Sequence, residues 1–326
     1  MSAISISVIV PFFNEKDNVF PFFQRLIPVL EALTYRWEVI AIDDGSQDGT
    51  EGALRAVHDY YSDVRIIRFS RNFGKEAALS AGLARVRGDH VLVIDGDLQH
   101  PPESLYEMMR IQERGVDMVY AVRQSRHTEG LIRGRFSSLF YRVFSMTSDI
   151  AIPPNASDFR LMSRRVVDAL NAVPEQTRFM KGLYAWVGFT QEAVKYDVEA
   201  RTNGVTKWSL GKLMGYAWNG IISFSVAPLR FWTFVGTVIA TLALLYAIWI
   251  GISTLAFGRD VPGYATLAVA IFFLGGLQLL SIGILGEYIA RIFTETKRRP
   301  LFVIEETTGF DAEHPSNIAL MQSSEA

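Results

Sequence analysis

Two long runs without a charged side chain lie in the last third of the chain, and they constrain its fold more than any other feature. Residues 231–258 and 261–286 contain no Asp, Glu, Lys or Arg. About 20 apolar residues are enough to cross the hydrocarbon core of a bilayer as a helix. A pair of buried core helices is the alternative, but helices this apolar on every side are uncommon in soluble proteins. The sequence therefore predicts a transmembrane hairpin over 229–293, with spans at about 231–257 and 264–286.

The charges around the two runs predict how the hairpin is oriented. A short turn joins the runs, and basic residues flank the outer ends of the hairpin: Lys207, Lys212 and Arg230 before it, and Arg291, Lys297, Arg298 and Arg299 after it. The positive-inside rule then places both ends on the cytoplasmic side. We expect an integral membrane protein whose termini and large N-terminal domain are cytoplasmic.

A third membrane feature, residues 208–228, directly precedes the hairpin. Apolar residues recur there at helical spacing: Leu210, Leu213, Met214, Ala217, Trp218, Ile221 and Ile222. Polar residues occupy the opposite face, which predicts an amphipathic helix at the membrane surface in contact with lipids. An ordinary helix facing a protein core has the same pattern. Its position beside the hairpin favours the interface.

The balance of residue types excludes several classes of protein. The chain has no cysteine, which excludes a disulfide scaffold, thiolate catalysis and a thiolate zinc site. Its 32 basic and 34 acidic residues nearly cancel, whereas a nucleic-acid binder normally carries a basic excess. We therefore expect no nucleic-acid partner. The five histidines show no metal-ligand spacing.

The first two thirds of the chain alternate between short β-branched runs and helical patterns. The predicted strands are 4–10, 38–42, 64–69, 90–94 and 118–122, and the predicted helices are 17–33, 49–60, 75–86 and 102–114. This alternation predicts an α/β domain over 1–207, with a mostly parallel sheet covered by helices on both faces. Ligands of such sheets bind outside the carboxyl ends of the strands.

Polar clusters follow four of these predicted strands. They are Pro11-Phe12-Phe13-Asn14-Glu15, Asp43-Asp44-Gly45-Ser46, Ser70-Arg71-Asn72-Phe73-Gly74-Lys75-Glu76 and Asp95-Gly96-Asp97-Leu98-Gln99. Each cluster alone could be a turn or a helix cap. Because all four converge on one edge of the sheet, we expect them to form a binding site.

The residues at this edge predict how a nucleotide would be held. Neither Gly-x-Gly-x-x-Gly nor Gly-x-x-x-x-Gly-Lys-Ser/Thr occurs. Asp95 and Asp97 instead suit a hard ion such as Mg²⁺ or Mn²⁺, which would bridge a diphosphate. Asp43 and Asp44 are better suited to hydrogen-bonding a base or ribose.

Several motifs together resemble the GT-A catalytic domain of inverting family-two glycosyltransferases. They are Val8-Ile9-Val10-Pro11 with Asn14-Glu15, Asp43-Asp44-Gly45-Ser46 and Asp95-Gly96-Asp97-Leu98-Gln99. Within that family the chain is most similar to polyprenyl-phosphate glycosyltransferases, and in particular to bactoprenol glucosyltransferases. The further motifs are Arg71-Asn72-Phe73-Gly74-Lys75-Glu76, Asp158-Phe159-Arg160-Leu161-Met162-Ser163-Arg164, Phe179-Met180-Lys181-Gly182, Pro228-Leu229-Arg230 and Leu285-Gly286-Glu287-Tyr288-Ile289. The resemblance covers residues 4–304.

The resemblance implies a nucleotide-sugar donor, UDP-glucose, an undecaprenyl phosphate acceptor, and a place in the bacterial inner membrane. It implies that Pro11, Asn14, Glu15, Asp43 and Asp44 line the nucleoside pocket, that Asp95 and Asp97 hold the metal and diphosphate, and that Gln99 faces the sugar. Asp97 is the expected direct metal ligand and Asp158 the expected catalytic carboxylate. Arg123, Arg201 and Lys207 are expected to contact phosphates.

Chemistry qualifies the role of Asp158. The acceptor phosphate is already anionic near neutral pH, so little proton removal is needed. A carboxylate facing it would repel it unless cations intervene. Asp158 could instead orient the sugar or position Arg160, and the alternatives of base and positioning residue stay open.

Other functions are compatible with the same motifs. GDP-mannose or a modified sugar nucleotide is the alternative donor. A processive polysaccharide synthase is disfavoured, because such enzymes usually carry Gln-x-x-Arg-Trp where this chain has Gln176-Thr177-Arg178-Phe179. A catalytically silent scaffold in glycan export is the non-enzyme alternative, which intact Asp95, Asp97 and Asp158 disfavour.

The tail, residues 294–326, is predicted to be cytosolic and to contain a strand at 300–305. An exposed edge strand can pair with another chain. We therefore expect a homo-oligomer, with a tetramer as the expected size.

Overall fold

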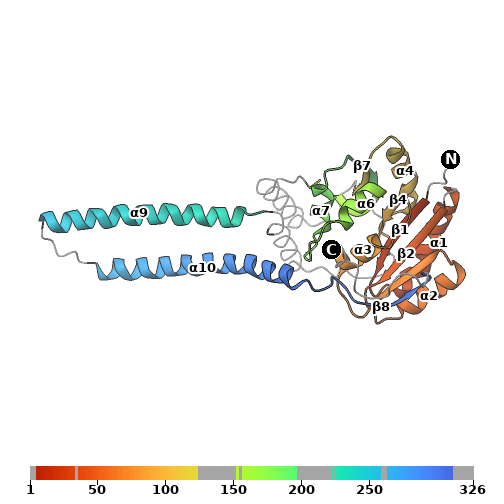
Figure 1. Cartoon of the computed structure of the whole chain (residues 1–326), viewed down its shortest axis with the longest axis horizontal. Coiled ribbons are helices and arrows are strands. Elements are labelled where there is room, and N and C mark those ends of the chain that lie inside the picture. The colour runs from red at the N-terminus through yellow and green to blue at the C-terminus, as the bar shows by residue number, and fades with distance from the viewer. Residues whose placement is uncertain are drawn as a thin grey trace, which may run out of the picture.

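The fold is a mixed sheet of eight strands with helices on both faces and a long helical hairpin attached (Figure 1). The computed structural model describes residues 5–33, 36–123, 152–153, 156–196, 222, 225–257 and 263–310. The strands run in the order β7-β5-β6-β4-β1-β2-β3-β8. Their bounds are β1 Ser5–Phe12, β2 Arg36–Asp43, β3 Val64–Phe69, β4 His90–Val93, β5 Met118–Arg123, β6 Ala156–Ser163, β7 Gln191–Tyr196 and β8 Ile304–Thr308.

Alternating side chains of the strands build one apolar layer on each face of the sheet. Val8 and Val10 of β1 pack in a core with α1 (Lys16–Ala32), α2 (Thr50–Tyr60) and α4 (Leu105–Glu113). Ile9, between them, packs on the opposite face with α3 (Lys75–Leu83), α6 (Arg164–Asn171) and α7 (Met180–Trp186). A short 3₁₀ turn, η1 (Pro102–Ser104), leads into α4. Strands buried on both faces explain the nearly continuous apolar runs of the sequence.

The strand pairing confirms the predicted α/β fold class. Four neighbouring pairs are parallel: β1 with β2, β1 with β4, β2 with β3, and β5 with β7. β6 is antiparallel to both of its neighbours, β4 and β5. The sequence pattern predicted neither β6 nor β7. Placing β6 beside β4 matters for the site, because it brings Asp158 to the strand that precedes Asp95.

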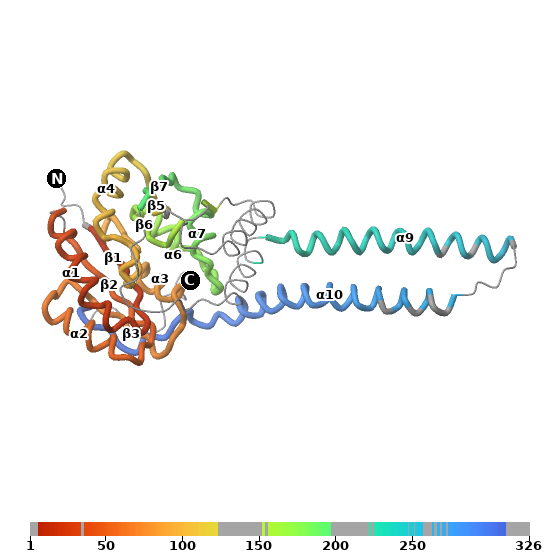
Figure 2. Tube along the Cα trace, turned by 180° about the vertical axis from the view of Figure 1, so that it is seen from behind, coloured from red at the N-terminus to blue at the C-terminus, as the bar shows by residue number. Residues whose placement is uncertain are grey.

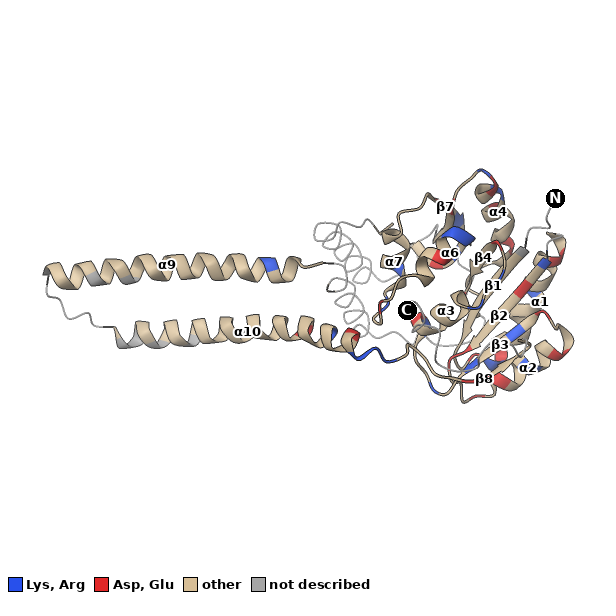
Figure 3. Ribbon diagram, in the orientation of Figure 1, with Lys and Arg blue, Asp and Glu red and all other residues tan. Residues whose placement is uncertain are grey.

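The hairpin consists of α9 (Ala227–Phe257) and α10 (Tyr264–Lys297), which lie side by side and project from the sheet domain in both views (Figures 1 and 2). Both are long and apolar enough to cross a membrane, and their most apolar stretches are not buried against other described parts of the chain. Within the described parts of α9 and α10, the positions of charged residues lie toward the sheet domain (Figure 3). A soluble core helix would be covered by protein, so this apolar surface fits a bilayer. The predicted interfacial helix lies outside the described residues except for Ile222 and 225–228.

The chain returns from the hairpin to the sheet. β8 pairs antiparallel with β3, in the register Ile66 with Thr308 and Arg68 with Glu306. The strand begins at Ile304, four residues after the start that the sequence predicted. Because β8 covers β3 within the same chain, this edge is already occupied. The predicted homotetramer stays a prediction.

The last turn of α10 is fastened to the sheet domain by Glu295. Its carboxylate accepts hydrogen bonds from the backbone N–H groups of Gln176, at 3.0 and 3.1 Å, and of Thr177, at 3.0 Å. An acidic side chain at a helix C-terminus is disfavoured by the helix dipole, so these amides give it a compensating environment. The loop that it holds leads directly into α7.

Replacing Glu295 with Gln is expected to loosen this loop. Hydrogen bonds to a charged group contribute about 1.5–3 kcal/mol, so amide exchange at Gln176 and Thr177 should accelerate by about tenfold or more. Hydrogen-exchange mass spectrometry of the full chain in detergent measures it. Thr294→Ala is the control, because the Thr294 hydroxyl bonds the Ala290 carbonyl of its own helix. Equal exchange in both variants would show that Glu295 does not hold the loop.

Candidate active site

The loops that follow β1 and β2 are tied together at the carboxyl edge of the sheet. The Asn14 N–H donates to Ser46 Oγ at 2.9 Å, and the Gln47 N–H donates to Asn14 Oδ1 at 2.9 Å. Asn14 has φ of 51°, a left-handed conformation that asparagine tolerates better than most residues. The Glu15 N–H donates to Thr50 Oγ1 at 3.0 Å. Pro11 lies within β1, opposite Ile42 of β2.

Asp43 and Asp44 brace the loops around this edge. The Ser46 N–H donates to Asp43 Oδ1 at 3.0 Å, and Asp43 is fully buried. The Asp44 carboxylate accepts the N–H groups of Phe73 at 2.7 Å and Gly74 at 3.0 Å. Burial raises the pKa of the Asp44 carboxyl above its ordinary value, although these two bonds act in the opposite direction. The predicted contact of either carboxylate with a nucleoside stays a prediction.

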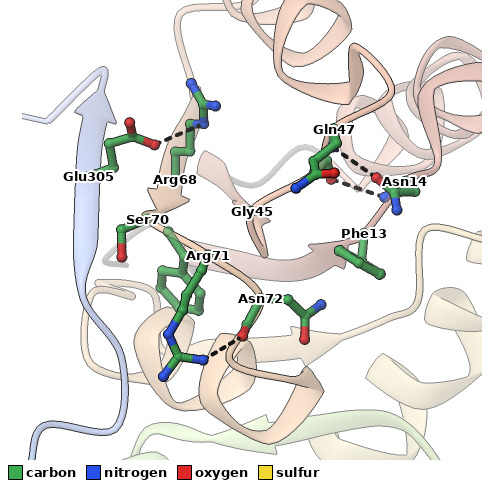
Figure 4. A pocket seen from close by; sticks show the side chains of 11 residues that line it. Phe13, Asn14, Gly45, Gln47, Arg68, Ser70, Arg71, Asn72 and Glu305 are labelled. Atoms are coloured by element: carbon green, nitrogen blue, oxygen red, sulfur yellow. Dashed lines mark hydrogen bonds and ion pairs between the residues drawn. The ribbon is translucent and has the colours of Figure 1, made fainter.

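A pocket of about 320 Å³ opens between these loops and β8 (Figure 4). It is lined by Phe13, Asn14, Gly45, Ser46, Gln47, Arg68, Phe69, Ser70, Arg71, Asn72 and Glu305. This volume lies at the small end of the range for ligand sites, about 300–1,000 Å³. An aromatic ring, several amide and hydroxyl groups and two guanidinium groups suit the nucleoside part of a nucleotide.

A second cluster joins three charged side chains from α3, from β6 and from the loop that follows β4. The Lys75 Nζ lies 2.6 Å from Asp95 Oδ1 and 2.9 Å from Asp158 Oδ2. Lys75 begins α3, only one residue after the Gly74 amide that Asp44 binds. The loop 70–74 therefore connects the pocket, which it lines through Ser70, to the charged cluster.

The charged groups of this cluster shift the pKa values of one another and so keep Asp158 and Lys75 ionised. Burial alone would raise the pKa of the Asp158 carboxyl, but the charges of Lys75 and then Lys181 outweigh it and hold that pKa well below its usual range. Burial alone would lower the pKa of the Lys75 ammonium, but Asp158 and Asp95 raise it well above its usual range. Asp158 is therefore an ionised and weakly basic carboxylate at neutral pH, which favours the positioning alternative over the base.

A fully buried guanidinium lies on β6 two residues after Asp158. Arg160 donates from Nε to the Ser157 carbonyl at 3.2 Å, and its guanidinium carbon lies 4.4 Å from the ring centroid of Tyr184 and 5.3 Å from that of Tyr120. Cation–π contacts are strong when they are shielded from water. Arg160 thus fixes the strand that carries Asp158.

The residues predicted to hold a metal are close to this cluster but differ in their partners. Asp95 binds Lys75, and Asp97 Oδ1 accepts the Gln99 N–H at 3.1 Å. Within the part of the chain that the structure describes, no group of three His, Asp or Glu side chains could hold a metal by itself. Mg²⁺ commonly binds through one or two carboxylates plus substrate phosphates. The donor set therefore fits a metal that binds together with a diphosphate.

Other predicted site residues fall outside the described part. Arg201 and Lys207 lie in the undescribed segment 197–221, and Arg123 is described only as the last backbone position of β5. The sequence patterns did not identify Arg68 and Glu305 as pocket residues or Lys75 as the bridge between two carboxylates. Lys75 belongs to the polar motif that follows the strand 64–69, which was the available signal, whereas Glu305 belongs to no such motif.

Charged side chains at the carboxyl edge of an α/β sheet, joined to an apolar hairpin, are the arrangement expected of a glycosyltransferase attached to a membrane. Comparison with known proteins agrees: residues 7–170 match Glycosyl transferase family 2 and residues 227–292 match the GtrB C-terminal hairpin. The chain therefore belongs to glycosyl transferase family 2, within the group that carries this hairpin.

Named relatives are similar over almost the whole chain. An uncharacterized glycosyltransferase of Synechocystis sp. is 46% identical over 308 residues, which cover 94% of this chain and 97% of the relative. The SfII prophage-derived bactoprenol glucosyl transferase of Shigella flexneri is 42% identical over 304 residues, 93% and 98% of the two chains. A prophage bactoprenol glucosyl transferase homolog of Escherichia coli K12 is 42% identical, covering 93% and 99%. The resemblance to bactoprenol glucosyltransferases is confirmed.

Proposed function

We propose that this protein transfers glucose from UDP-glucose to undecaprenyl phosphate, with inversion, at the cytoplasmic face of the bacterial inner membrane. The observation that carries the proposal is the 42% identity, across 93% of the chain, to a relative named as a bactoprenol glucosyl transferase. The pocket, the charged cluster and the hairpin supply the three parts that this reaction needs: a nucleotide site, a reaction centre and attachment to the membrane that holds the acceptor.

The reaction is a single displacement at the anomeric carbon. An oxygen of the acceptor phosphate forms a bond to this carbon, the bond to the β-phosphate oxygen breaks, and UDP leaves with the electron pair. The acceptor oxygen is already anionic, so the step requires no base. This agrees with the depressed pKa of the Asp158 carboxyl.

Lys75 resolves the repulsion between Asp158 and an anionic acceptor. Its ammonium lies 2.9 Å from Asp158 Oδ2, and the charge of Lys181 also acts on this carboxylate. With both cations nearby, a phosphate could approach without meeting an isolated negative charge. Asp158 then orients Lys75, and Lys75 offsets charge on the reacting phosphates.

Asp97, with Asp95 nearby, would hold Mg²⁺ or Mn²⁺ together with the donor diphosphate. Such an ion would supply stabilisation of the negative charge that develops on the leaving UDP. Arg123, Arg201 and Lys207 are proposed to bind phosphates of donor and acceptor, and Gln99 to face the sugar. The basic ends of the hairpin support the cytoplasmic orientation.

The test is release of UDP from the full chain in phospholipid vesicles with Mg²⁺ or Mn²⁺ present. UDP-glucose should release UDP when undecaprenyl phosphate is added, and GDP-mannose should release little GDP. Turnover of GDP-mannose instead would support the alternative donor. If none of several sugar nucleotides releases its nucleotide, the result would support the alternative function, a catalytically silent scaffold.

A further inference from the structure

The segment that follows the hairpin touches three consecutive residues of the pocket wall. The Phe302 ring stacks on Phe69, with centroids 5.0 Å apart and planes 12° from parallel. The Val303 carbonyl accepts the Ser70 N–H at 3.0 Å. Glu305 Oε2 lies 3.3 Å from Arg68 Nε, and Glu305 itself lines the pocket (Figure 4). The pocket is therefore incomplete without chain that lies beyond the membrane hairpin.

Arg68 is held among three carboxylates. Besides Glu305, its guanidinium pairs with Glu51 and lies 3.9 Å from Asp43 Oδ2. Asp43 Oδ2 is buried and makes no hydrogen bond within the described residues. A guanidinium carries one positive charge, so this end of the pocket keeps an acidic excess. An uncharged group with N–H or O–H donors is favoured there, and a phosphate is repelled.

The loop 70–75 leads from this part of the pocket to the charged cluster. It carries Arg71, whose guanidinium carbon lies 4.0 Å from the Phe73 ring centroid, and ends at Lys75. Under the proposed function the diphosphate lies toward Asp95 and Asp97, where a divalent ion would bind with it, so the nucleoside lies toward β8.

We propose that Glu305, on the strand that follows the hairpin, is a specificity-determining residue of the donor pocket that accepts hydrogen bonds from the nucleoside and holds Arg68. This inference rests on the proposed function. The nucleoside of UDP offers such donors in its imide N–H and ribose hydroxyls. α10 ends at Lys297, so the first contact of the returning chain with a pocket residue, Phe302 on Phe69, lies only five residues beyond this helix.

The neighbouring residue supplies a matched control. Glu306 pairs with Arg55 of α2 and does not line the pocket. Glu305→Gln and Glu306→Gln each remove one charge from the same strand and one ion pair from the same sheet edge. A difference between the two variants therefore reports the pocket rather than the stability of β8.

The experiment measures steady-state transfer by the full chain in vesicles containing undecaprenyl phosphate, with UDP and inorganic pyrophosphate as competing inhibitors. Glu305→Gln should raise KM for UDP-glucose and the inhibition constant of UDP by about tenfold, because a charged hydrogen-bond acceptor is lost. It should leave kcat and inhibition by pyrophosphate, which has no nucleoside, within about twofold. Glu306→Gln should change all four values by less than about twofold.

Three results would overturn the inference: equal donor KM in the two variants, equal loss of UDP and pyrophosphate inhibition in Glu305→Gln, or loss of kcat alone. If wild-type protein transfers glucose but the two variants agree, only the role of Glu305 fails. If wild-type protein neither transfers glucose nor is bound by UDP in equilibrium dialysis, the proposed function itself fails.

Discussion

Asp158→Asn is expected to lower kcat for glucosyl transfer by about 100- to 1,000-fold, the usual cost of removing one preorganised charged group from a reaction centre. The variant keeps the shape of the side chain but removes the charge that holds Lys75 at 2.9 Å. Lys75 would then pair with Asp95 alone. Because Asp158 contacts the cluster rather than the pocket, KM for UDP-glucose should change by less than about threefold. Transfer of labelled glucose to lipid measures both values.

Asp168→Asn is the control for this variant. Asp168 forms an exposed i,i+4 pair with Arg164, 3.9 Å apart, and its side chain is 65% exposed. Its loss should change kcat by less than about twofold.

The pH profile separates the two roles of Asp158. A positioning carboxylate leaves the shape of the residual profile unchanged, whereas loss of a general base removes its acid limb. A kcat of Asp158→Asn within threefold of wild type, or a pH profile of this variant without the acid limb, would contradict the positioning role.

Gly45→Ala is expected to raise KM for UDP-glucose by about 30- to 150-fold. Gly45 has φ of +68°, and a Cβ there would lie 2.4 Å from the backbone carbonyl carbon of Arg71. The left-handed conformation and the displaced loop together would cost about 2–3 kcal/mol, which corresponds to that change in affinity. The clash pushes apart the two loops that line the pocket. The dissociation constant of UDP, measured by calorimetry on the full chain, gives the same change independently of turnover.

Gly49→Ala is the matched control for the clash. Gly49 also has positive φ, +93°, but a Cβ there would meet only the flexible Lys16 side chain, at 3.4 Å. It shares the conformational strain without the backbone collision, so its KM should rise by less than about fivefold. Equal effects of the two variants would show that strain alone, and not the Gly45–Arg71 contact, shapes the pocket.

Local sequence patterns predicted most of the catalytic sheet correctly. Strands such as 64–69 were predicted to the residue, because β-branched runs buried on both faces leave a clear signal. Both apolar helices were visible as uncharged runs. β6 and β7 were missed, since β6 mixes polar and apolar residues around a buried Arg160 whose environment comes from Tyr120 and Tyr184. No local pattern encodes such a tertiary environment.

The sequence predicted that the candidate site lies at the ends of the strands, but it did not predict which side chains pair with one another there. Asp95 and Asp158 were expected on separate grounds, yet the cation that joins them depends on α3 starting beside β6. The contribution of Glu305 could not be read from the sequence at all. It is 260 positions from Gly45, and only the return of the chain to β3 brings the two to one pocket.

The central claim is tested most directly by identifying the lipid product. The full chain, in vesicles containing undecaprenyl phosphate and Mg²⁺ or Mn²⁺, is supplied with UDP-glucose labelled in the sugar, and the lipid fraction is examined by mass spectrometry and anomeric NMR. The account predicts a single hexose on undecaprenyl phosphate in the β configuration, because one displacement inverts the α linkage of UDP-glucose. Label that stays in the aqueous fraction, or an α-linked lipid product, would contradict it.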